Sequence, residues 1–367
     1  MLFRSRDIIT ISKQPRRLLS EPRLAAFPEL EARGEQRPDR EGRHLLSMDP
    51  PQHGRYRRLI SGRFTPRALR AMEADIDGIT TTILDEIATD GEKGEIDFVE
   101  KVSSILPLAV IANMLGVPQS DWKLLFQWTN EMIGSGDPEY RREGETPDET
   151  SQRARLAAVG YFAEMVEERR QRPRDDLVSV LANAEVGGGP LPVENLMAYF
   201  NLIVIAGNET TRNATSGGLL ALIENPGEFE KIRRDPSLIP SAVEEILRWT
   251  TPVIQFCHTA SEELEIGGQK IGAGESLCLF YPSANRDEDV FEEPFRFAVD
   301  REPNPHLAFG IGEHSCLGAN LARSELVAMF RQLVRRLQEV ELAGPVERLR
   351  SCFLGGVKHM PIRYRLR

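Results

Sequence analysis

The stretch FGIGEHSCLG, residues 309–318, leads straight into a helical pattern that runs from Ala319 to about Leu337. Its glycines allow the backbone to turn tightly and to approach a flat ligand closely. The N-terminus of the following helix favours the thiolate form of Cys316, because its free N–H groups and its dipole stabilise an anion. The pattern therefore indicates a loop that presents one sulfur to a single metal. A buried cysteine in a helix-start turn is the simpler alternative.

Length and composition are those of an ordinary folded protein: 367 residues, of which 41% are hydrophobic and 28% are charged. The four cysteines form neither a C-x-x-C pair nor a disulfide framework, which fits a reducing compartment. The N-terminal residues lack a signal-peptide core, and no apolar stretch is long enough to cross a bilayer. We therefore expect a cytoplasmic protein without a membrane anchor. The net charge of −10 argues against nucleic acid as a partner.

Apolar residues at three- and four-residue spacing predict that most of the chain is helical. The predicted helices lie near 66–90, 119–134, 149–171, 193–224, 238–249 and 317–338. Strand-like patterns are confined to regions near 251–285 and 340–367, with a hairpin pattern around Phe353–Leu366. The acidic segment Gly134–Thr150 predicts a mobile surface loop. We expect a mainly α fold with a small β portion, formed as a single domain over residues 1–367.

A second unusual stretch is AGNETT, residues 206–211, in the middle of a predicted helix of roughly 30 residues. An interior glycine is poor helix design, since it costs up to about 1 kcal/mol relative to alanine. The Thr210 hydroxyl can bond the carbonyl of Ala206, which opens a notch for a small ligand. Glu209 and Thr210 could deliver protons at this notch. The alternative is a tolerated glycine on an ordinary polar helix face.

Two charge patterns complete the set. Glu245 and Arg248 are spaced to pair on one helical face, where an exposed pair contributes only a few tenths of a kcal/mol. His53 and Arg57 lie one turn apart, and two cations at this spacing repel unless an anion sits between them. They begin a segment from Pro51 to Arg70 that has no acidic residue and six arginines: Arg55, Arg57, Arg58, Arg63, Arg67 and Arg70. This basic face is either a solvated helix surface or a dock for an acidic partner.

Together these motifs resemble those of the cytochrome P450 family. Residues 309–318 are similar to its haem-ligand loop, Phe-x-x-Gly-x-His/Arg-x-Cys-x-Gly, and residues 206–211 to its distal-helix motif, Ala/Gly-Gly-x-Asp/Glu-Thr-Thr. Residues 245–248 match its Glu-x-x-Arg motif. The resemblance extends from about residue 5 to the C-terminus. It implies the cytochrome P450 fold with haem b, iron protoporphyrin IX, as the cofactor.

The resemblance implies a set of cofactor-binding residues: His53, Arg57, Ala206, Gly207, His258, Phe309, Gly310, His314, Cys316 and Gly318. Cys316 is the implied ligand of the haem iron, and the basic side chains are the implied partners of the haem propionates. His258 departs from the pattern, because many relatives have an arginine there, and a histidine makes haem retention pH-sensitive. The resemblance implies that dioxygen binds beside Ala206 and Gly207, with Thr210 hydrogen-bonding to it and Glu209 supplying protons from solvent.

Two further groups of residues follow from the resemblance. Glu245 and Arg248 are expected to be buried, joined by a third arginine and structural in role. Arg301 is the expected third arginine, and Arg296 is the alternative. The residues expected to face a hydrophobic substrate are Ile203, Val253, Ile254 and Phe353.

The implied activity is that of a bacterial-type haem-thiolate monooxygenase, which inserts one oxygen atom from O2 into a steroid, terpenoid or fatty-acid-like molecule. No flavin or nicotinamide domain fits in the rest of the chain, so we expect electrons from a ferredoxin and a ferredoxin reductase, with residues 55–70 as the dock. Arg6–Pro15 resembles the family's second helix, which implies that the first helix and most of the first strands are missing, through a misassigned start or a true truncation. The alternative function is haem binding without oxygenase activity, as a sensor or a truncated relic.

Overall fold

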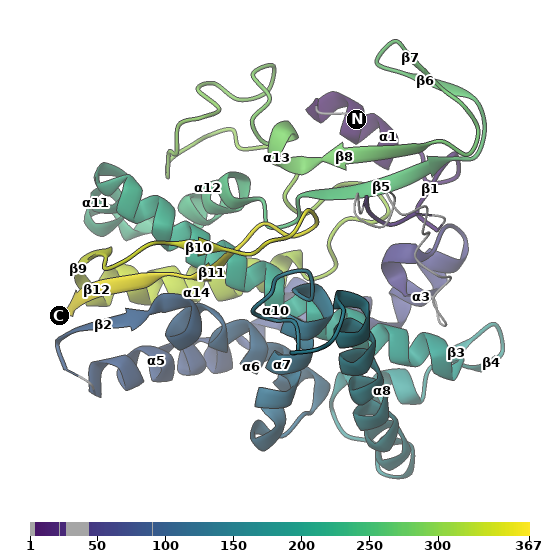
Figure 1. The fold of residues 1–367 in the computed structure, drawn as a ribbon, viewed down its shortest axis with the longest axis horizontal. Coiled ribbons are helices and arrows are strands. Elements are labelled where there is room, and N and C mark those ends of the chain that lie inside the picture. The colour runs from purple at the N-terminus through teal and green to yellow at the C-terminus, as the bar shows by residue number, and fades with distance from the viewer. Residues whose placement is uncertain (1–3, 22, 27–43, 90) are drawn as a thin grey trace.

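The computed structural model describes residues 4–21, 23–26, 44–89 and 91–367. It is mainly helical with a small β portion, as predicted, and Figure 1 shows the order of the elements. Its helices are α1 (Ser5–Ser12), α3 (Gln52–Ser61), α4 (Pro66–Arg70), α5 (Glu73–Thr89), α6 (Ile105–Leu115), α7 (Trp122–Ile133), α8 (Pro147–Gln171), α9 (Leu177–Ala182), α10 (Val193–Glu224), α11 (Pro226–Arg234), α12 (Ile239–Thr250), α13 (Tyr281–Ala284) and α14 (Ala319–Arg336).

The strands form small antiparallel sheets. They are β1 (Leu18–Leu19), β2 (Lys93–Asp97), β3 (Glu185–Val186), β4 (Gly189–Pro190), β5 (Gln255–Ala260), β6 (Leu264–Ile266), β7 (Gln269–Ile271), β8 (Ser276–Phe280), β9 (Leu337–Leu342), β10 (Glu347–Arg348), β11 (Val357–His359) and β12 (Pro361–Leu366). One three-stranded sheet has the order β1-β5-β8 and another the order β2-β12-β9. The remaining strands pair as β3-β4, β6-β7 and β10-β11.

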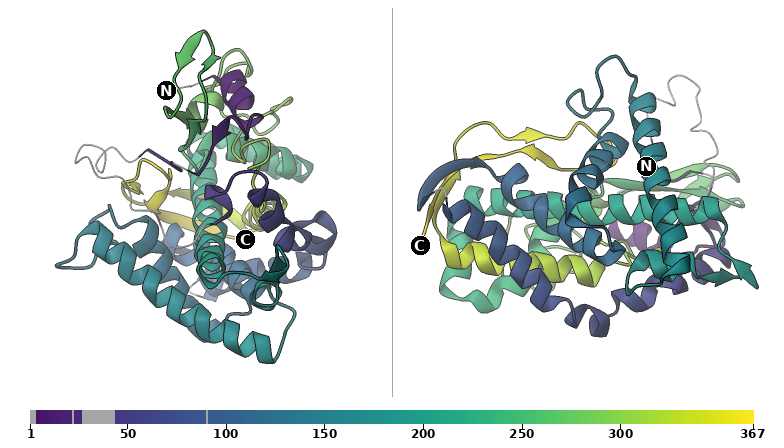
Figure 2. Two further views of the ribbon diagram at one scale, coloured as in Figure 1. Left: turned by 90° about the vertical axis from the view of Figure 1, so that its right-hand side faces the viewer. Right: turned by 90° about the horizontal axis from the view of Figure 1, so that it is seen from below.

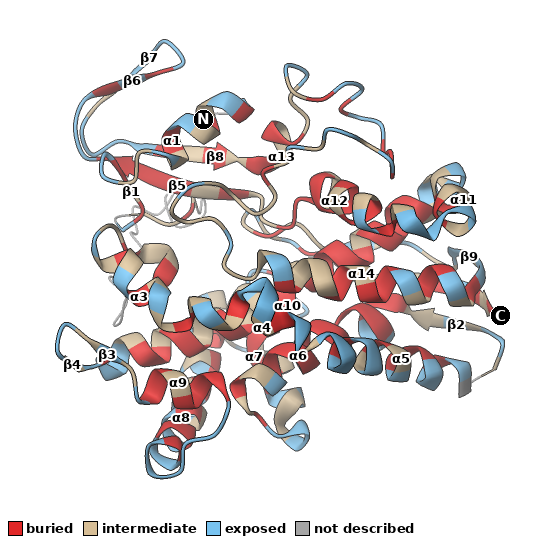
Figure 3. Cartoon of the chain, turned by 180° about the vertical axis from the view of Figure 1, so that it is seen from behind, coloured by how far each residue is buried: buried red, intermediate tan, exposed pale blue. Residues whose placement is uncertain are grey.

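Helix α10, with 32 residues, crosses the middle of the molecule. The sheet β1-β5-β8 lies on one side of it and α8 on the other (Figures 1 and 2). An apolar cluster that runs from Leu45 to Leu366 packs around α10, α12 and α14, and a smaller one lies under α1 and the sheet β1-β5-β8. Figure 3 shows the buried residues concentrated where α10 and α14 lie, with exposed residues on the outer faces of α5 and α11.

Local sequence explains several of the helix ends. Helix α8 starts with a capping box, in which the Thr146 hydroxyl accepts from the Glu149 N–H and the Glu149 carboxylate accepts from the Thr146 N–H. Pro147 occupies its first turn, where the missing N–H costs nothing. Helix α6 ends at Gly116, which has a φ of 74° and so closes the helix in the left-handed conformation.

The structure corrects three of the predictions about secondary structure. The predicted hairpin at Phe353–Leu366 does not form, because β12 pairs with β2 and β9 whereas β11 pairs with β10. The basic segment 55–70 is not one helix: α3 ends at Ser61, and Thr65 caps the separate helix α4. The predicted helix 66–90 is likewise divided into α4 and α5.

The segment Gly134–Thr150, predicted as a mobile loop, is tied to the C-terminal strands. Asp137 accepts hydrogen bonds from the Arg350 N–H and the Lys358 ammonium, each at 3.2 Å. Lys358 also lies 2.7 Å from Glu139. These contacts fix the connection between α7 and α8 to strands that are more than 200 residues away in the chain.

Candidate active site

The cysteine loop has the geometry that its glycines predict. Gly310 and Gly312 have φ angles of 63° and 82°, a region that other residues rarely adopt. The Cys316 N–H donates to the Phe309 carbonyl at 2.8 Å, which closes the loop. A Cβ on Gly312 would lie 2.3 Å from the carbonyl oxygen of Ser12, so α1 packs directly on this glycine. Gly318 then caps α14, and the loop presents the sulfur at the start of that helix.

The facing wall is the middle of α10. The Thr210 hydroxyl donates to the Ala206 carbonyl at 2.9 Å, the contact that the sequence predicts, and the helix remains continuous around it. Gly207 also has a packing role, since a Cβ there would lie 2.9 Å from the Ile111 side chain of α6. The small residues Ala206 and Gly207 thus let α6 approach α10, and their side chains take up little of the cavity.

One cavity unites the two walls. All ten residues expected to bind the cofactor line it, and so does Thr210. Ala206 and Cys316 lie deep in the fold and yet are accessible, because both face this cavity. Much of the remaining lining is apolar, with Ile60, Phe64, Leu202, Ile203, Val253 and Phe256 as examples. The arrangement leaves room for a flat ligand between the sulfur and α10.

Basic side chains gather at one end of this cavity. The ring centroids of His53 and His314 lie 4.1 Å apart, and the Ser20 hydroxyl contacts both His258 and His314. Burial, then the charges of His53, His258 and Arg57, lowers the pKa of His314 to about 3. Burial also lowers the pKa values of His53 and His258. An anion placed among these groups would favour their protonated forms.

Cys316 is not a thiolate by virtue of the loop alone. Cys316 lies deep in the fold, and burial raises the pKa of its thiol because it disfavours the charged form. The Gly318 N–H and the charges of Arg57 and Arg323 act in the opposite direction without cancelling the effect. A cation bound at the sulfur would complete the deprotonation, as metals do for coordinating thiols.

Glu209 differs from the other expected residues because it does not line the cavity. It is buried and forms an ion pair with Arg212, one turn along α10, and Arg212 donates to Asn130 of α7 at 2.9 Å. One carboxylate oxygen of Glu209 is without a hydrogen bond. Burial raises the pKa of Glu209, and the positive charge of Arg212 partly offsets this.

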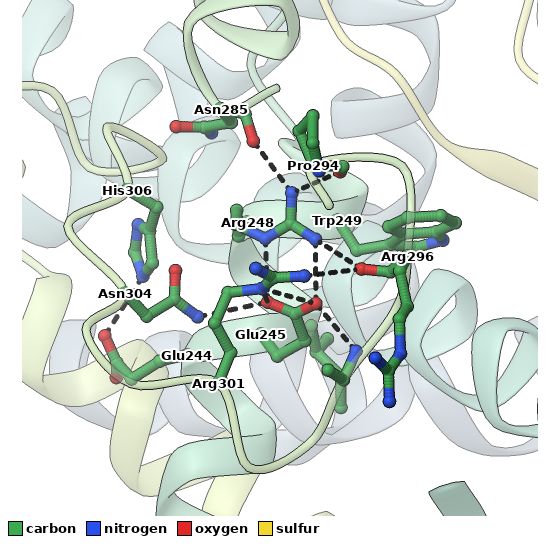
Figure 4. A network of polar contacts seen from close by, with 12 residues as sticks. Glu244, Glu245, Arg248, Trp249, Asn285, Pro294, Arg296, Arg301, Asn304 and His306 are labelled. Atoms are coloured by element: carbon green, nitrogen blue, oxygen red, sulfur yellow. Dashed lines mark hydrogen bonds and ion pairs between the residues drawn. The ribbon is translucent and has the colours of Figure 1, made fainter. Parts of the chain in front are cut away.

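Behind the cysteine loop, Glu245 and Arg248 form a fully buried pair on α12 with contacts at 2.7 Å (Figure 4). Arg301 donates to Glu245 at 3.1 Å, so the expected third arginine is present. Arg296 takes part through its carbonyl, which accepts from both other arginines, while its side chain pairs with Glu293 at the surface. The network joins α12 to the segment that precedes the cysteine loop.

The structure separates the four residues expected to face a substrate. Ile203 and Val253 line the cavity. Ile254 instead lines a second cavity, beside Asn213 and Trp249, because neighbouring residues of an extended chain point to opposite sides. Phe353 lines neither cavity and packs against Phe256, with ring centroids 5.5 Å apart.

Sequence reasoning missed several contacts around the site. Arg323 of α14 donates to Glu244 at 2.7 and 2.8 Å and lies 4.6 Å from the centroid of the Phe309 ring. Glu325 is also on α14. It is buried and lines the cavity, and burial raises its pKa to about 8. The ion pair of Glu209 with Arg212 was visible only as a three-residue spacing, and nothing in that spacing distinguishes a buried pair from an exposed one.

Comparison with known proteins decides the family. Residues 26–349 match the family model described as Cytochrome P450. This chain is a cytochrome P450. It is 40% identical over 321 residues to a steroid C26-monooxygenase of Mycolicibacterium smegmatis, a match that covers 87% of this chain and 73% of that protein. It is 38% identical over 323 residues to a methyl-branched lipid omega-hydroxylase of Mycobacterium tuberculosis, with 87% and 74% covered.

Solved P450 structures give the same result for the fold. Cytochrome P450 CYP268A2 of Mycobacterium marinum, in complex with pseudoionone, has a TM-score of 0.91 and 37% identity, and the match covers 98% of this chain and 86% of that one. CYP109E1 of Bacillus megaterium, in complex with testosterone, has a TM-score of 0.87 and 34% identity over 99% and 91%. The present P450 is therefore a haem b monooxygenase, since its relatives are monooxygenases and hydroxylases of this family.

The cavity of this P450 fits haem. In the described part of the chain no three His, Cys, Asp or Glu side chains converge to hold a metal, whereas the cavity offers single thiols: Cys257 in β5 and Cys316 in the glycine loop that faces α10. A single protein sulfur such as that of Cys316 would suit an iron whose remaining protein-independent ligands come from a porphyrin. The cluster of His53, Arg57, His258 and His314 suits the two carboxylates of that porphyrin. In the same described part no helix has the length and apolar character needed to cross a membrane.

Proposed function

We propose that this P450 hydroxylates a steroid or a methyl-branched lipid. The main support is the apolar lining of the cavity between Cys316 and α10, which gives a hydrophobic substrate a place beside the cofactor. The names of its relatives support the same substrate class, since they include a steroid C26-monooxygenase and a methyl-branched lipid omega-hydroxylase. Both names refer to the end of a hydrocarbon chain, so we propose a long molecule that enters with its apolar end first. A cytoplasmic location stays part of the proposal.

The residues of the chain divide the work in this proposal. Haem, when bound, would supply the activation of dioxygen, and Cys316 would hold its iron. The carboxylates of the porphyrin would be held by His53, Arg57, His258 and His314. The small side chains of Ala206 and Gly207 leave space beside α10 for a small molecule. Ile203 and Val253 exclude water and orient the substrate.

Proton delivery falls to the middle of α10. Thr210 lines the cavity and can exchange its hydrogen bond to the Ala206 carbonyl for one to a ligand. Glu209 is the adjacent residue of α10, and burial raises its pKa, which favours the protonated form that a proton donor needs. Because Arg212 holds the carboxylate, Glu209 must leave that ion pair before it can receive a proton from solvent. Arg212 is thus a positioning residue for Glu209.

The basic surface of α3 and α4 is the proposed dock for an acidic ferredoxin. Arg55, Arg58, Arg67 and Arg70 are exposed, whereas Arg63 pairs with Asp175. Helix α3 touches the cysteine loop through a 3.1 Å contact between His53 and Glu313, so an electron that arrives here is close to the sulfur. We expect Arg58→Glu to slow reduction by ferredoxin and to flatten its salt dependence. Lys93→Glu on β2 is the control, because it changes the charge equally at the far end of the molecule (Figure 1).

The decisive experiment is a spectral titration of the haem-loaded protein with three compounds: a steroid that has a full side chain, testosterone and a methyl-branched fatty acid. A substrate that binds beside the haem would shift the haem absorption. We expect a saturable shift with the first and third compounds and a hydroxylated chain end in turnover with reduced ferredoxin. Saturation by testosterone alone, or by none of the three, would overturn the proposed substrate class.

A further inference from the structure

Two cysteines outside the proposed catalytic machinery face each other across a pair of strands. Cys257 of β5 and Cys278 of β8 are register partners in the antiparallel sheet β1-β5-β8. Cys257 is buried and lines the cavity, and Cys278 is half-buried. Directly opposite residues of an antiparallel pair place their side chains on the same face. The two sulfurs are therefore neighbours.

The backbone hydrogen bonds identify the kind of pair. The Cys257 N–H donates to the Leu24 carbonyl at 2.8 Å, on the side of β5 away from β8. The backbone bonds that cross to the strand of Cys278 involve the even-numbered residues on the Cys257 side. The Ala260 N–H donates to the Glu275 carbonyl, and the Ile254 carbonyl accepts from the Tyr281 N–H. Cys257 and Cys278 thus form a non-hydrogen-bonded pair, for which the Cα separation is about 4.5 Å. A disulfide spans Cα separations of about 4.4–6.8 Å, so the backbone already meets this requirement.

The side chains also converge. The Cys257 and Cys278 sulfurs lie 3.7 and 3.3 Å from the same atom, Oε1 of Gln255. The backbone of Ala26 holds the Gln255 side chain in place. The Gln255 amide donates to the Ala26 carbonyl and accepts from the Ala26 N–H. The hydrogen bond between the two thiols lowers the pKa of Cys278 and raises that of Cys257. Cys278 is half-buried and Cys257 is buried, so Cys278 is the more accessible sulfur of the pair and the one that an oxidant reaches first.

We propose that Cys257 and Cys278 are a redox-sensitive modification site, which hydrogen peroxide converts into a reversible cross-strand disulfide. The Cys278 thiolate attacks peroxide: a sulfur–oxygen bond forms, the oxygen–oxygen bond breaks, and the departing hydroxide takes a proton to become water. The Cys257 sulfur then attacks the sulfenic acid, a sulfur–sulfur bond forms, and a second water leaves with the proton of Cys257. Two thiols are oxidised and one peroxide is reduced.

The bond fastens part of the cavity wall. Phe256 and His258, the neighbours of Cys257 in β5, line the same cavity as the cysteine loop. Opposite Cβ atoms of an antiparallel pair lie about 4.5–5.5 Å apart, with non-hydrogen-bonded pairs at the short end, and a disulfide spans about 3.5–4.5 Å. Forming the bond therefore joins β5 to β8 with little movement of the strands, and a thiol reductant reverses it by thiol–disulfide exchange.

Peptide mapping tests the proposal directly, because Lys270 lies between the two cysteines. The haem-loaded protein is treated with hydrogen peroxide, or with diamide as a second oxidant, and the remaining thiols are alkylated before digestion with trypsin. We expect the peptides Trp249–Lys270 and Ile271–Arg286 to appear joined, and to separate after treatment with dithiothreitol. The measurement counts thiols rather than turnover, so its result is independent of the proposed substrate.

Two variants complete the test. Cys352→Ser removes an exposed cysteine and should leave the joined peptides unchanged, whereas Cys278→Ser should abolish them. The mapping of the unaltered protein decides the question even where a variant folds poorly. Joining of either peptide to the one that contains Cys352 would overturn the proposal. So would conversion of Cys278 to a sulfinic acid without any joined pair.

Discussion

The buried pair of Glu245 and Arg248 makes a sharp prediction about stability. Every partner of the Glu245 carboxylate is a donor: Arg248, Arg301, Asn304 and the Ala298 N–H. In Glu245→Gln an amide NH2 therefore faces donors, and two arginines lose their counter-charge. Removing one member of a buried ion pair costs about 3–5 kcal/mol. At about 2 °C per kcal/mol for a large domain, the midpoint of thermal unfolding should fall by about 6–10 °C.

The chain contains a matched control. Glu293 and Arg296 have the same three-residue spacing and the same 2.7 Å contact, but both side chains are exposed. Glu293→Gln should leave the unfolding midpoint, followed by circular dichroism, within experimental error, because water screens an exposed pair. Equal shifts for the two variants would refute the reasoning, since burial is the feature in which the pairs differ. Arg248→Lys should also lower the unfolding midpoint even though it keeps the positive charge, because an ammonium group cannot make all five contacts of this guanidinium.

Three further predictions concern the site. Cys316→Ser should alter the absorption spectrum of the reduced, carbon monoxide-bound protein and abolish turnover, and an unchanged Soret spectrum would contradict the assignment of the sulfur to the iron. Arg212→Met should raise the pKa of Glu209 further, since the cation now opposes the effect of burial; the basic limb of the pH–turnover profile should then move to higher pH, whereas Arg212→Lys should leave it in place. Burial alone would raise the pKa of Glu244, but hydrogen bonds from Arg323 and His306 bring it to about 2. A depressed carboxyl pKa stabilises the fold above the pKa of the unfolded chain and loses that effect as pH falls toward 2, so Glu244→Gln should weaken the dependence of the unfolding midpoint on pH between about 4.5 and 2.

The helical part of the fold was predictable because its periodicity is local. Helices α8, α10, α12 and α14 lie within two residues of their predicted bounds, and each has a clear apolar stripe or cap. Strand partners were not predictable, because pairing depends on residues that are far apart in sequence. Strand β12 pairs with β2, more than 250 residues earlier, and no pattern within 353–366 distinguishes this from a local hairpin.

The candidate site shows the same division. Cys316, Thr210 and the basic residues were found from short motifs, and the structure brings all of them to one cavity. The partner of Glu209 and the orientation of Ile254 were not found, because each depends on how an element is rotated against its neighbours. A spacing of three residues describes the buried pair of Glu245 and the exposed pair of Glu293 equally well. Burial, which separates them, is a property of the assembled fold.

The close approach of Gly312 to Ser12 has a practical consequence for anyone who shortens this protein. Helix α1 rests on the loop that carries the sulfur, and the Ser5 N–H anchors that helix to Asp287 at 2.7 Å. A deletion that removes α1 also removes the backbone against which Gly312 of the cysteine loop packs. Expression tags are therefore better placed ahead of an intact α1. The haem content of a shortened variant should be measured before its turnover is compared with that of the full chain.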